Sequence, residues 1–477
     1  MERHAGAGLL RKPDVTLPQR LARSAQTTDG VTSDAAVHEW IARRNAEQVH
    51  DVRRIPFSAL HRWSFDDDTG NLAHDTGRFF TVEGLDVYTD YGHVANWSQP
   101  IINQPEIGIL GIAVKEIDGV LHCLMQAKSE PGNVNGVQIS PTVQATKSNY
   151  TRVHQGKPVP YLDYFRRPAP ENVLADVLQS EQGSWFYRKR NRNMIVEITE
   201  DIEPTEDFCW LTIGQLHQLL KIDNAINMDT RTVLSCMPAG LEGSSADSRG
   251  ELAGAIARSS EPTAGSLHTQ VEVMSWITAR QAQHVVHTTP IPLRDVKRWN
   301  RTATEISHEL GLYFSIIGVE ITTNSREVMS WTQPLVQPHG TGMVALLVKR
   351  VDGVLHALVN ARVEPGYLDV VELAPTVQCT PENYAMLSNT DQPPFLDIAL
   401  HRGQDQVLFD TELSEEGGRF HHARSRYQII EVPADFPDEE LDDYRWLTLH
   451  QLNELLRHSH YVNVQARSLI ACLRGLR

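Results

Sequence analysis

The chain has 477 residues, with 60 acidic and 44 basic side chains and a net charge of −16 at pH 7. This acidic balance excludes a general surface for nucleic acid or anionic membranes, because both need a basic stripe. No apolar run is long enough to span a bilayer, the N-terminus lacks an apolar signal core, and the five cysteines show no Cys-x-x-Cys spacing. We therefore expect a cytoplasmic protein with free thiols.

Residues 1–36 are polar, mixed in charge and without periodicity, which predicts a disordered N-terminal arm. Hydrophobic spacing then predicts, in chain order, a helix at 39–47, strands at 107–116, 120–127 and 193–198, and a helix at 211–220. Asp118-Gly119 between the first two strands is a strong hairpin signal. Thr212 is placed to cap the second helix.

The same pattern occurs twice. Residues 79–150 align with residues 313–384 without a gap, and 28 of the 72 positions are identical. The second set of expected elements lies at 275–283, 343–350, 354–361, 427–432 and 447–456. Residues 238–266 are dense in Gly, Ser, Ala and Glu, which predicts a flexible linker between repeat 1 (37–237) and repeat 2 (267–477). Strands and helices do not alternate regularly, so each repeat is expected to be an α+β domain with a mixed sheet flanked by helices.

The sequence lacks dinucleotide-binding, phosphate-loop, zinc-protease and α/β-hydrolase motifs. Residues 410–420 resemble the tail of the Nudix box, a helix that aligns carboxylates on a divalent metal to cleave a nucleoside diphosphate. The matching positions are Glu412, Glu415, Glu416 and Gly418. Thr411 replaces the arginine of the box, and the upstream Gly and Glu are missing. The segment is therefore either a nucleoside-diphosphate pocket that has lost metal-driven hydrolysis or a solvated acidic turn.

A longer motif is more specific. The pattern Glu-Pro-Gly-x5-Gln-x-Ser-Pro-Thr-Val-Gln-Ala-Thr-x-Ser-Asn-Tyr at 130–150 has its counterpart at 364–384. In a tandem chain of this length it resembles the NDP-hexose 2,3-dehydratase family, from about residue 37 onward. The resemblance implies two Nudix-like domains in a homodimer that removes the C2 hydroxyl of dTDP-4-keto-6-deoxyglucose, for deoxysugar biosynthesis in natural products. The alternatives are a Nudix-type hydrolase of nucleotide sugars and a non-catalytic nucleotide-sugar-binding module.

The chemistry implied by this resemblance needs neither a cofactor nor a metal. The C4 ketone acidifies the C3 proton, a general base removes that proton, and a general acid protonates the departing C2 hydroxyl. The enol then relaxes to a 3,4-diketone, which a downstream 3-ketoreductase is expected to capture. Since no hydride moves, the protein has to supply only a base, an acid and donors for the C4 oxyanion.

Substrate-binding candidates come from both repeats. Trp63 and Trp299, in identical Arg-Trp contexts, suit stacking on thymine, with burial in the core as the alternative. Lys128 and Arg362 align beside Glu-Pro-Gly and are expected to face the diphosphate. The remaining candidates are polar or charged groups of the loops and of the acidic segment: Thr146, Ser148, Asn149, Tyr150, Arg152, Thr380, Asn383, Glu415, Glu416 and Arg419.

The repeats differ at positions whose side chains could act in catalysis. Repeat 1 has Asn133, Asn135 and Gln138, whereas repeat 2 has Tyr367, Asp369 and Glu372. Because an amide cannot take a proton, Glu372 and Asp369 are the predicted acid and base candidates, with Tyr384 as a third catalytic candidate. We expect one catalytic and one vestigial pocket, with catalysis in repeat 2, although a pocket can also borrow residues from the other repeat or another subunit. Replacing Glu372 with Gln is predicted to lower kcat by about 10²–10⁴.

Overall fold

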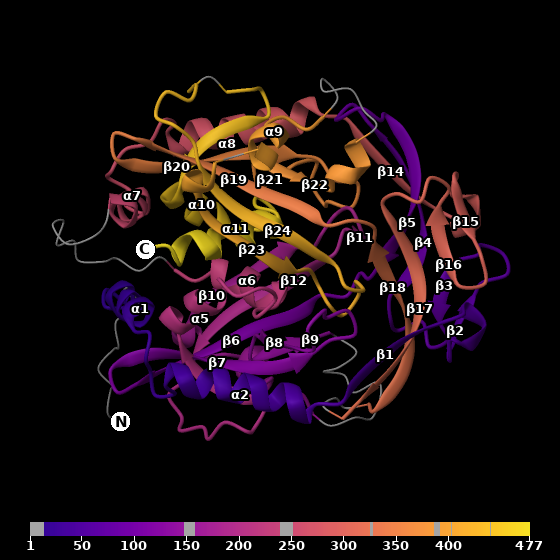
Figure 1. Ribbon diagram of the computed structural model, residues 1–477, viewed down its shortest axis with the longest axis horizontal. Coiled ribbons are helices and arrows are strands. Elements are labelled where there is room, and N and C mark those ends of the chain that lie inside the picture. The colour runs from indigo at the N-terminus through magenta and orange to yellow at the C-terminus, as the bar shows by residue number, and fades with distance from the viewer. Residues whose placement is uncertain are drawn as a thin grey trace, which may run out of the picture.

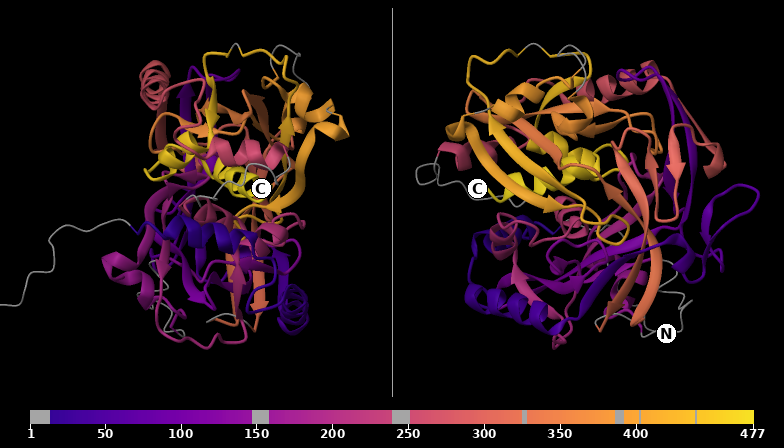
Figure 2. Two further views of the ribbon diagram at one scale, coloured as in Figure 1. Left: turned by 90° about the vertical axis from the view of Figure 1, so that its left-hand side faces the viewer. Right: turned by 45° about the vertical axis from the view of Figure 1, so that its right-hand side comes forward.

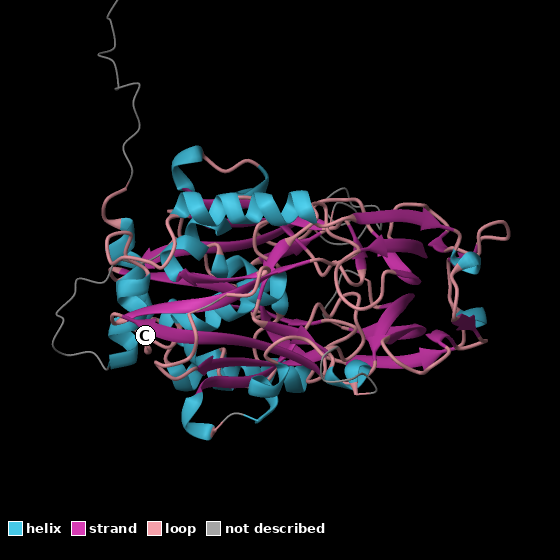
Figure 3. Cartoon of the chain, turned by 90° about the horizontal axis from the view of Figure 1, so that it is seen from above, coloured by secondary structure: helices cyan, strands magenta, loops and turns pink. Residues whose placement is uncertain are grey.

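The computed structural model describes residues 14–146, 158–238, 251–324, 328–385, 392–401, 403–438 and 440–477. Each repeat contributes one large mixed sheet, and the two large sheets lie one above the other in Figure 1, with two smaller sheets beside them. Seen from above, helices flank the stacked sheets, and the small sheets form the end away from the C-terminus (Figure 3). The α+β class and the tandem duplication are thus confirmed.

The large sheets are built alike. In repeat 1 the hydrogen-bonded order is β10 (Val173–Ser180), β12 (Arg190–Glu197), β6 (Gly108–Ile117), β7 (Val120–Ser129) and β13 (Phe208–Thr212), with β8 (Val137–Ser140) on β7 and β9 (Val143–Ala145) on β6. In repeat 2 the order is β23 (Val407–Ser414), β24 (Arg424–Glu431), β19 (Gly342–Val351), β20 (Val354–Arg362) and β21 (Glu372–Ala374), with β22 (Val377–Cys379) on β19 and β25 (Tyr444–Thr448) on β20. The predicted hairpins at 118–119 and 352–353 are present, with positive φ angles at both residues of each turn.

The small sheets exchange one strand between the repeats. One sheet runs β11 (Phe186–Tyr187), β5 (Asn96–Asn103), β4 (Thr81–Thr89), β3 (Leu72–His74) and β2 (Trp63–Phe65), and takes β14 (Val286–Ile291) of repeat 2 on β4. The other contains β17 (Phe314–Thr323), β16 (Glu305–His308), β15 (Trp299–Arg301) and β18 (Ser330–Pro338), and takes β1 (His50–Ile55) of repeat 1 on β17. Figure 1 shows β1 crossing to β17. This exchange holds the two repeats in one body.

The helices occur in corresponding sets. Repeat 1 has α1 (Leu17–Gln26), α2 (Asp34–Glu47), α4 (Asp163–Arg166), α5 (Ile213–Leu219) and α6 (Met228–Ser235), and repeat 2 has α7 (Glu251–Ser259), α8 (Gln270–Gln283), α9 (Leu396–His401), α10 (Leu449–Leu456) and α11 (Val464–Arg474). Short 3-10 helices are η1 (Phe57–Ala59), η2 (Pro170–Asn172), η3 (Leu293–Asp295), η4 (Pro381–Tyr384) and η6 (Gln404–Gln406). Thr212 and Thr448 each form a capping box with the glutamine three residues on, as their positions predicted.

Helices α6 and α11 meet between the large sheets, where the two lobes of Figure 2 join. The buried Arg231 of α6 donates to the carbonyl of Ser414 in repeat 2 at 2.6 Å, and the buried Arg467 of α11 donates to the carbonyl of Ser180 in repeat 1 at 2.5 Å. Each arginine also bonds a hydroxyl on the opposite helix, Ser468 or Thr232. Because buried guanidinium groups are costly without acceptors, these reciprocal bonds fix how the repeats face each other.

The predicted boundaries of the repeats need correction. Helix α1 lies within residues 1–36, which were expected to be a disordered arm, and α7 lies within 238–266, which was expected to be a linker. Both helices pack in the same way, since Ser24 donates to the carbonyl of Leu121 and Ser259 donates to that of Leu355. The equivalent sequences Leu-Ala-Arg-Ser and Ile-Ala-Arg-Ser end at these two serines. The duplication therefore begins before residue 37.

The acidic segment at 410–420 is not the helix of a Nudix box. Strand β23 runs to Ser414, and a turn follows. Glu412 on the strand pairs with Arg424 at 3.0 Å, while Glu415 is buried. Because successive carboxylates of a strand point to different sides, they do not converge as on one helix face. In the described part of the chain, no helix is long and apolar enough to cross a membrane.

Candidate active site

Two equivalent contacts join the Glu-Pro-Gly turn of one repeat to the acidic turn of the other. At junction 1, Glu130-Pro131-Gly132 meets residues 416–422, and at junction 2, Glu364-Pro365-Gly366 meets residues 182–188. The N–H of Gly132 donates to the carbonyl of Gly417 at 2.7 Å, and the N–H of Gly366 donates to that of Gly183 at 2.8 Å. Each site thus combines both repeats.

The shared glycines are required by this close approach. A Cβ atom at Gly132 would lie 1.6 Å from the carbonyl oxygen of Phe420, and one at Gly366 would lie 1.8 Å from that of Phe186. Such distances are far inside van der Waals contact, so neither position accepts a side chain without backbone movement. The backbone geometry of the two junctions is therefore the same, and any difference in chemistry comes from side chains.

Junction 1 gathers carboxylates and cations. Glu130 accepts a hydrogen bond from Gln144 at 2.8 Å and lies 3.8 Å from the ammonium of Lys128. Glu181 accepts one from Asn191 at 2.7 Å, and Lys189 donates to the carbonyl of Glu106. Repeat 2 adds two partly exposed side chains, Glu416 and Arg419. Arg419 stacks over the ring of Phe80 at 4.4 Å and donates to Gln104 at 3.2 Å.

Burial and crowding shift the protonation of this cluster. Burial raises the pKa of Glu416 to about 7, and the carboxylate of Glu130 adds to that rise while Arg419 opposes it. Burial lowers the pKa of Lys189 to about 8, against the opposite influence of Glu181. The pKa of Asp229, at the start of α6, is raised by burial and by the neighbouring carboxylates. Groups with pKa values near neutrality can exchange protons with a substrate at the working pH.

Several buried oxygens of this cluster have no hydrogen-bond partner. They are Oδ1 of Asn133, Oε2 of Glu181, Oδ1 of Asp229 and Oε2 of Glu416. Buried polar atoms are nearly always paired in folded proteins, so a group of orphaned acceptors at one place marks a site that a ligand or water completes.

At junction 2 the carboxylates are saturated instead, although Oε1 of Gln182 and Oε1 of Gln465 are buried without a partner. Glu364 accepts from Arg362 at 2.9 Å, from Gln378 at 3.0 Å and from the N–H of Ser184 at 3.1 Å. The buried Glu415 accepts from the side chains of Gln182 at 2.6 Å, Ser425 at 2.7 Å and Tyr427 at 3.2 Å. Each carboxylate already has three donors. Tyr367 packs against Gly183 and accepts from Asn463 at 3.2 Å, which fills the place taken by Asn133 in junction 1.

The mirrored positions show what junction 2 lacks. In the alignment of the repeats, Glu416 of junction 1 corresponds to Gln182, Lys189 to Ala423, Asp229 to Gln465 and Arg419 to Trp185. Trp185 packs against Phe420 with ring centroids 4.6 Å apart. All four replacements remove a charge, so the titratable cluster belongs to junction 1 alone.

The predicted catalytic carboxylates lie elsewhere. Glu372 is 1% exposed, accepts a hydrogen bond from Ser180 at 2.5 Å, and occupies the mirror place of Gln138, which accepts from Ser414. Burial raises the pKa of Glu372 to about 8, which disfavours the ionised base predicted at this position. Asp369 is exposed on the loop before β21.

The tryptophans are packing residues in this structure. Trp63 is 7% exposed and lies 4.8 Å from Phe80 and 5.3 Å from His74, measured between ring centroids. Trp299 is partly buried, 4.7 Å from Phe314, and its indole N–H donates to the carbonyl of Ser98 at 3.1 Å. The structure favours the alternative of core packing over stacking on thymine.

The other predicted residues are divided between the two junctions and the parts that are not described. Lys128, Glu416 and Arg419 lie at junction 1, while Arg362 and Glu415 lie at junction 2. Tyr384 and Asn383 belong to η4, Thr380 precedes it, and Thr146 follows β9. Burial raises the pKa of Tyr384, and Arg362 opposes the rise. Four predicted residues lie outside the described residues: Ser148, Asn149, Tyr150 and Arg152.

Four members of the cluster were missed from the sequence: Glu130, Glu181, Lys189 and Asp229. The comparison of the repeats could have found two of them, because Lys189 aligns with Ala423 and Asp229 with Gln465. Such replacements of a charged residue by a neutral one are informative in a duplication. Among the described residues, no group of three or more His, Cys, Asp or Glu side chains is arranged to hold a metal ion.

The structure defines the class of the protein. It is a duplicated α+β protein whose repeats exchange strands and share two unlike polar junctions. The sequence profile of the NDP-hexose 2,3-dehydratases matches both repeats, at residues 34–237 and 270–473. The chain belongs to the NDP-hexose 2,3-dehydratase family, and its members are hydro-lyases.

Three relatives carry the name dTDP-4-dehydro-6-deoxy-alpha-D-glucopyranose 2,3-dehydratase. The protein from Saccharopolyspora spinosa is 53% identical over 94% of this chain and 93% of its own length. The one from Amycolatopsis orientalis is 50% identical over 96% and 93%, and the one from Streptomyces violaceoruber is 46% identical over 94% and 98%. The similarity thus spans nearly the whole of each chain.

Proposed function

We propose that this protein removes the C2 hydroxyl of dTDP-4-keto-6-deoxy-D-glucose as water, and that junction 1 is the catalytic site. The names of the relatives support the substrate. The site is supported by one observation, the titratable cluster that junction 1 has and junction 2 lacks. The reaction yields the 3,4-diketo-2,6-dideoxy sugar.

Glu416 acts as the general base in this proposal. With its pKa near 7, about half of the molecules carry an ionised carboxylate at neutral pH. The C3 proton moves to this carboxylate, and the electron pair of the C–H bond is delocalised onto the C4 oxygen as an enolate. As the enolate collapses, the C4 carbonyl re-forms, the pair becomes the C3–C2 double bond and the C2–O bond breaks. The partial exposure of Glu416 leaves it accessible to a ligand, whereas Glu372 is enclosed.

Lys189 acts as the general acid. Its pKa near 8 keeps most of the ammonium protonated at pH 7, yet makes its proton easier to give than that of an ordinary lysine. The proton joins the departing C2 hydroxyl to form water. Arg419, which stays charged, stabilises the negative charge that develops on the C4 oxygen. The resulting enol takes a proton at C2 and becomes the diketone.

The surrounding groups position this pair. Gln144 bonds Glu130 and also accepts from Asn227 at 3.3 Å, which ties the Glu-Pro-Gly turn to the start of α6. Asn191 holds Glu181 and accepts from the N–H of Gly108 at 3.1 Å. Because misplacement by about 1 Å can cost about 100-fold in rate, such bonds matter although they do not touch the substrate.

The test is incubation of the purified protein with dTDP-4-keto-6-deoxyglucose, with and without EDTA, followed by mass spectrometry. We expect a product lighter by one water, at a rate that chelator changes by less than about twofold, because proton transfer alone carries the reaction. Release of dTMP that depends on Mg²⁺ would identify a hydrolase. Binding without any product would identify a binding module.

Two finer features from the family resemblance also belong to this proposal. The protein is a homodimer, which light scattering of the purified chain would test. The diketone is unstable, so a 3-ketoreductase consumes it, and adding such an enzyme with its nicotinamide cofactor should give a stable reduced sugar.

A further inference from the structure

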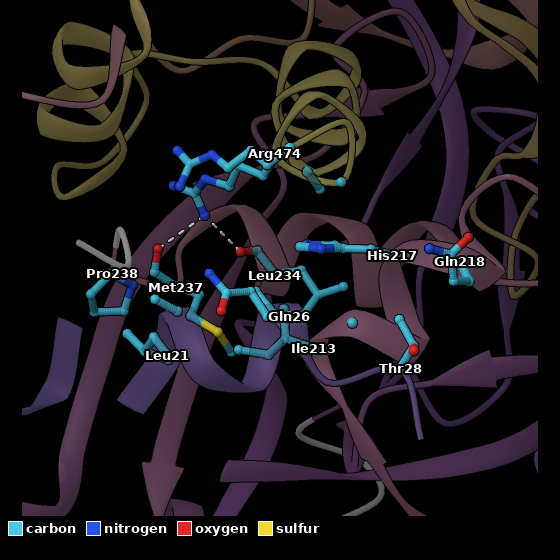
Figure 4. A pocket seen from close by; sticks show the side chains of 16 residues that line it. Leu21, Gln26, Thr28, Ile213, His217, Gln218, Leu234, Met237, Pro238 and Arg474 are labelled. Carbon is cyan, nitrogen blue, oxygen red and sulfur yellow. Dashed lines mark hydrogen bonds between the residues drawn. The ribbon is translucent and has the colours of Figure 1, made fainter. Parts of the chain in front are cut away.

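A second site lies away from both junctions. A cavity of about 330 Å³ opens between helices α1 and α5 and the C-terminal ends of α6 and α11 (Figure 4). One wall is apolar, formed by Leu21, Ala25, Ile213, Leu234 and Met237. None of the residues that line the cavity belongs to the titratable cluster of junction 1.

The opposite wall carries the positive charge of Arg474, whose side chain is partly buried. The guanidinium of Arg474 donates to the carbonyls of Leu234 at 3.1 Å and Met237 at 3.0 Å, and to the amide oxygen of Asn453 at 2.6 Å. All three acceptors are neutral, and Nε of Arg474 is buried without a partner. Figure 4 shows the two carbonyl contacts at the edge of the cavity.

No acidic side chain balances this charge. The lining contains Arg474 and Arg477 but no aspartate or glutamate among the described residues. Burial, with the positive charge of Arg477, lowers the pKa of Arg474 to about 10, and burial lowers that of His217 to about 3, so the imidazole is neutral. A partly buried charge without a counter-ion is costly, and an anion that enters the cavity relieves that cost.

This charge is not a general feature of the fold. Residues of both repeats line this cavity, and at the mirrored place His217 corresponds to Asn453 and Arg474 to Pro238. The basic wall is therefore present at one of the two mirrored places only. A structural arginine that fixed the helix packing in general would be expected in both copies.

We propose that this cavity binds a small organic anion whose charged group lies against Arg474 and whose short apolar body lies against Leu21, Ile213 and Met237. The volume is at the lower end of the range for small-molecule sites, which fits a body of a few carbon atoms. The apolar wall selects against inorganic ions, and the buried guanidinium selects against neutral molecules.

Titration calorimetry of the full chain with hexanoate tests the proposal, with inorganic phosphate and hexan-1-ol as the probes for charge alone and apolar body alone. We expect hexanoate to bind with one site and to bind more tightly than either of the others. Arg474→Gln should weaken hexanoate binding at least about tenfold through loss of the charged hydrogen bond. Ala25→Leu, which narrows the cavity and leaves Arg474 in place, should also abolish binding.

Arg457→Gln is the matched control, because Arg457 is an exposed arginine whose side chain is 73% exposed and pairs with Glu454. It should bind hexanoate like the wild type. Equal binding of hexanoate and hexan-1-ol would overturn the proposal, as would unchanged hexanoate affinity in both Arg474→Gln and Ala25→Leu. A phosphate affinity equal to the hexanoate affinity would overturn the proposed contact between the apolar wall and the body of the ligand. No outcome depends on sugar turnover, so the test is independent of the proposed reaction.

Discussion

The two junctions share one backbone geometry but differ in the chemistry of their side chains. Both bring a Glu-Pro-Gly turn against a glycine turn of the other repeat, with main-chain bonds of 2.7 and 2.8 Å. At junction 2 every carboxylate has its donors, and aromatic side chains fill the remaining space. At junction 1, Glu181 and Glu416 each retain one unpartnered oxygen, and a lysine of lowered pKa lies beside them.

This difference separates what the fold needs from what a reaction needs. The glycines, the glutamates at 130 and 364 and the interface arginines occur in both copies, and each has a structural contact that explains it. Glu416, Lys189 and Asp229 occur in one copy, and the other copy keeps the same backbone geometry with Gln182, Ala423 and Gln465 in their places. A duplication thus marks candidate catalytic residues as those that break its symmetry.

The largest expected effect is at the proposed base. Glu416→Gln keeps the shape of the side chain and makes junction 1 resemble junction 2, where Gln182 stands. We expect kcat to fall by about 10²–10⁴, the usual contribution of general acid–base catalysis. Steady-state assays with dTDP-4-keto-6-deoxyglucose measure it. The mirror variant Gln182→Glu should not create a second active site, and a doubled rate in that variant would contradict the comparison.

The proposed acid comes next. Lys189→Ala introduces the residue that repeat 2 has at this position, Ala423. We expect kcat to fall about 100-fold, because the departing hydroxyl then takes its proton from water. The fall of activity above pH 8 should disappear at the same time, since it reflects loss of the Lys189 proton. An unchanged alkaline limb would show that another group is the acid.

Variants of the two shared glycines test whether the junctions have the same backbone geometry. Gly132→Ala and Gly366→Ala each force a Cβ to within 2 Å of a carbonyl oxygen, at 1.6 Å and 1.8 Å. We expect both to lower the free energy of unfolding by about 3 kcal/mol, the cost of a severe overpacking. Chemical denaturation measures the loss. A loss at one glycine only would mean that the two junctions do not share one backbone geometry.

The smallest effect is on stability at Glu372. Its pKa of about 8 in the folded protein exceeds the ordinary value of 4.5, so burial favours the protonated form. The stability that this group contributes is complete below pH 4.5 and is lost as the pH rises through about 8. Glu372→Gln cannot ionise, so its Tm should exceed that of the wild type by about 2–4 °C at pH 9, with a smaller difference at pH 6 and none at pH 4. A Tm difference that does not change with pH would refute this assignment.

Much of the fold could be predicted from the sequence. The duplication, the hairpins at Asp118-Gly119 and Asp352-Gly353 and the caps at Thr212 and Thr448 all depend on local residue patterns. The exchange of β1 and β14 could not be predicted, because it pairs strands far apart in the sequence and a strand carries no mark of its partner. Helices α1 and α7 were missed since each is short and the segments around them are polar.

The site was predicted only in part. Glu415, Glu416 and Arg419 of the acidic segment were predicted to bind substrate, and Glu130-Pro131-Gly132 was recognised only as part of the family motif. The meeting of one repeat with the other was left open. Glu372 was preferred because it can ionise, yet its ionisation depends on burial beside Ser180, which no spacing reveals. Lys189 was passed over because its pKa depends on burial that only the folded chain creates.

The most direct test is the pH dependence of kcat/KM for Glu416→Gln and Glu372→Gln, measured side by side with the wild type. The wild type should show a bell, rising as Glu416 loses its proton near pH 7 and falling as Lys189 loses its proton near pH 8. We predict that Glu372→Gln keeps the bell and most of the rate, while Glu416→Gln loses the rise near pH 7 and most of the rate. Loss of rate and of the rise in Glu372→Gln, with a normal profile for Glu416→Gln, would move catalysis to repeat 2.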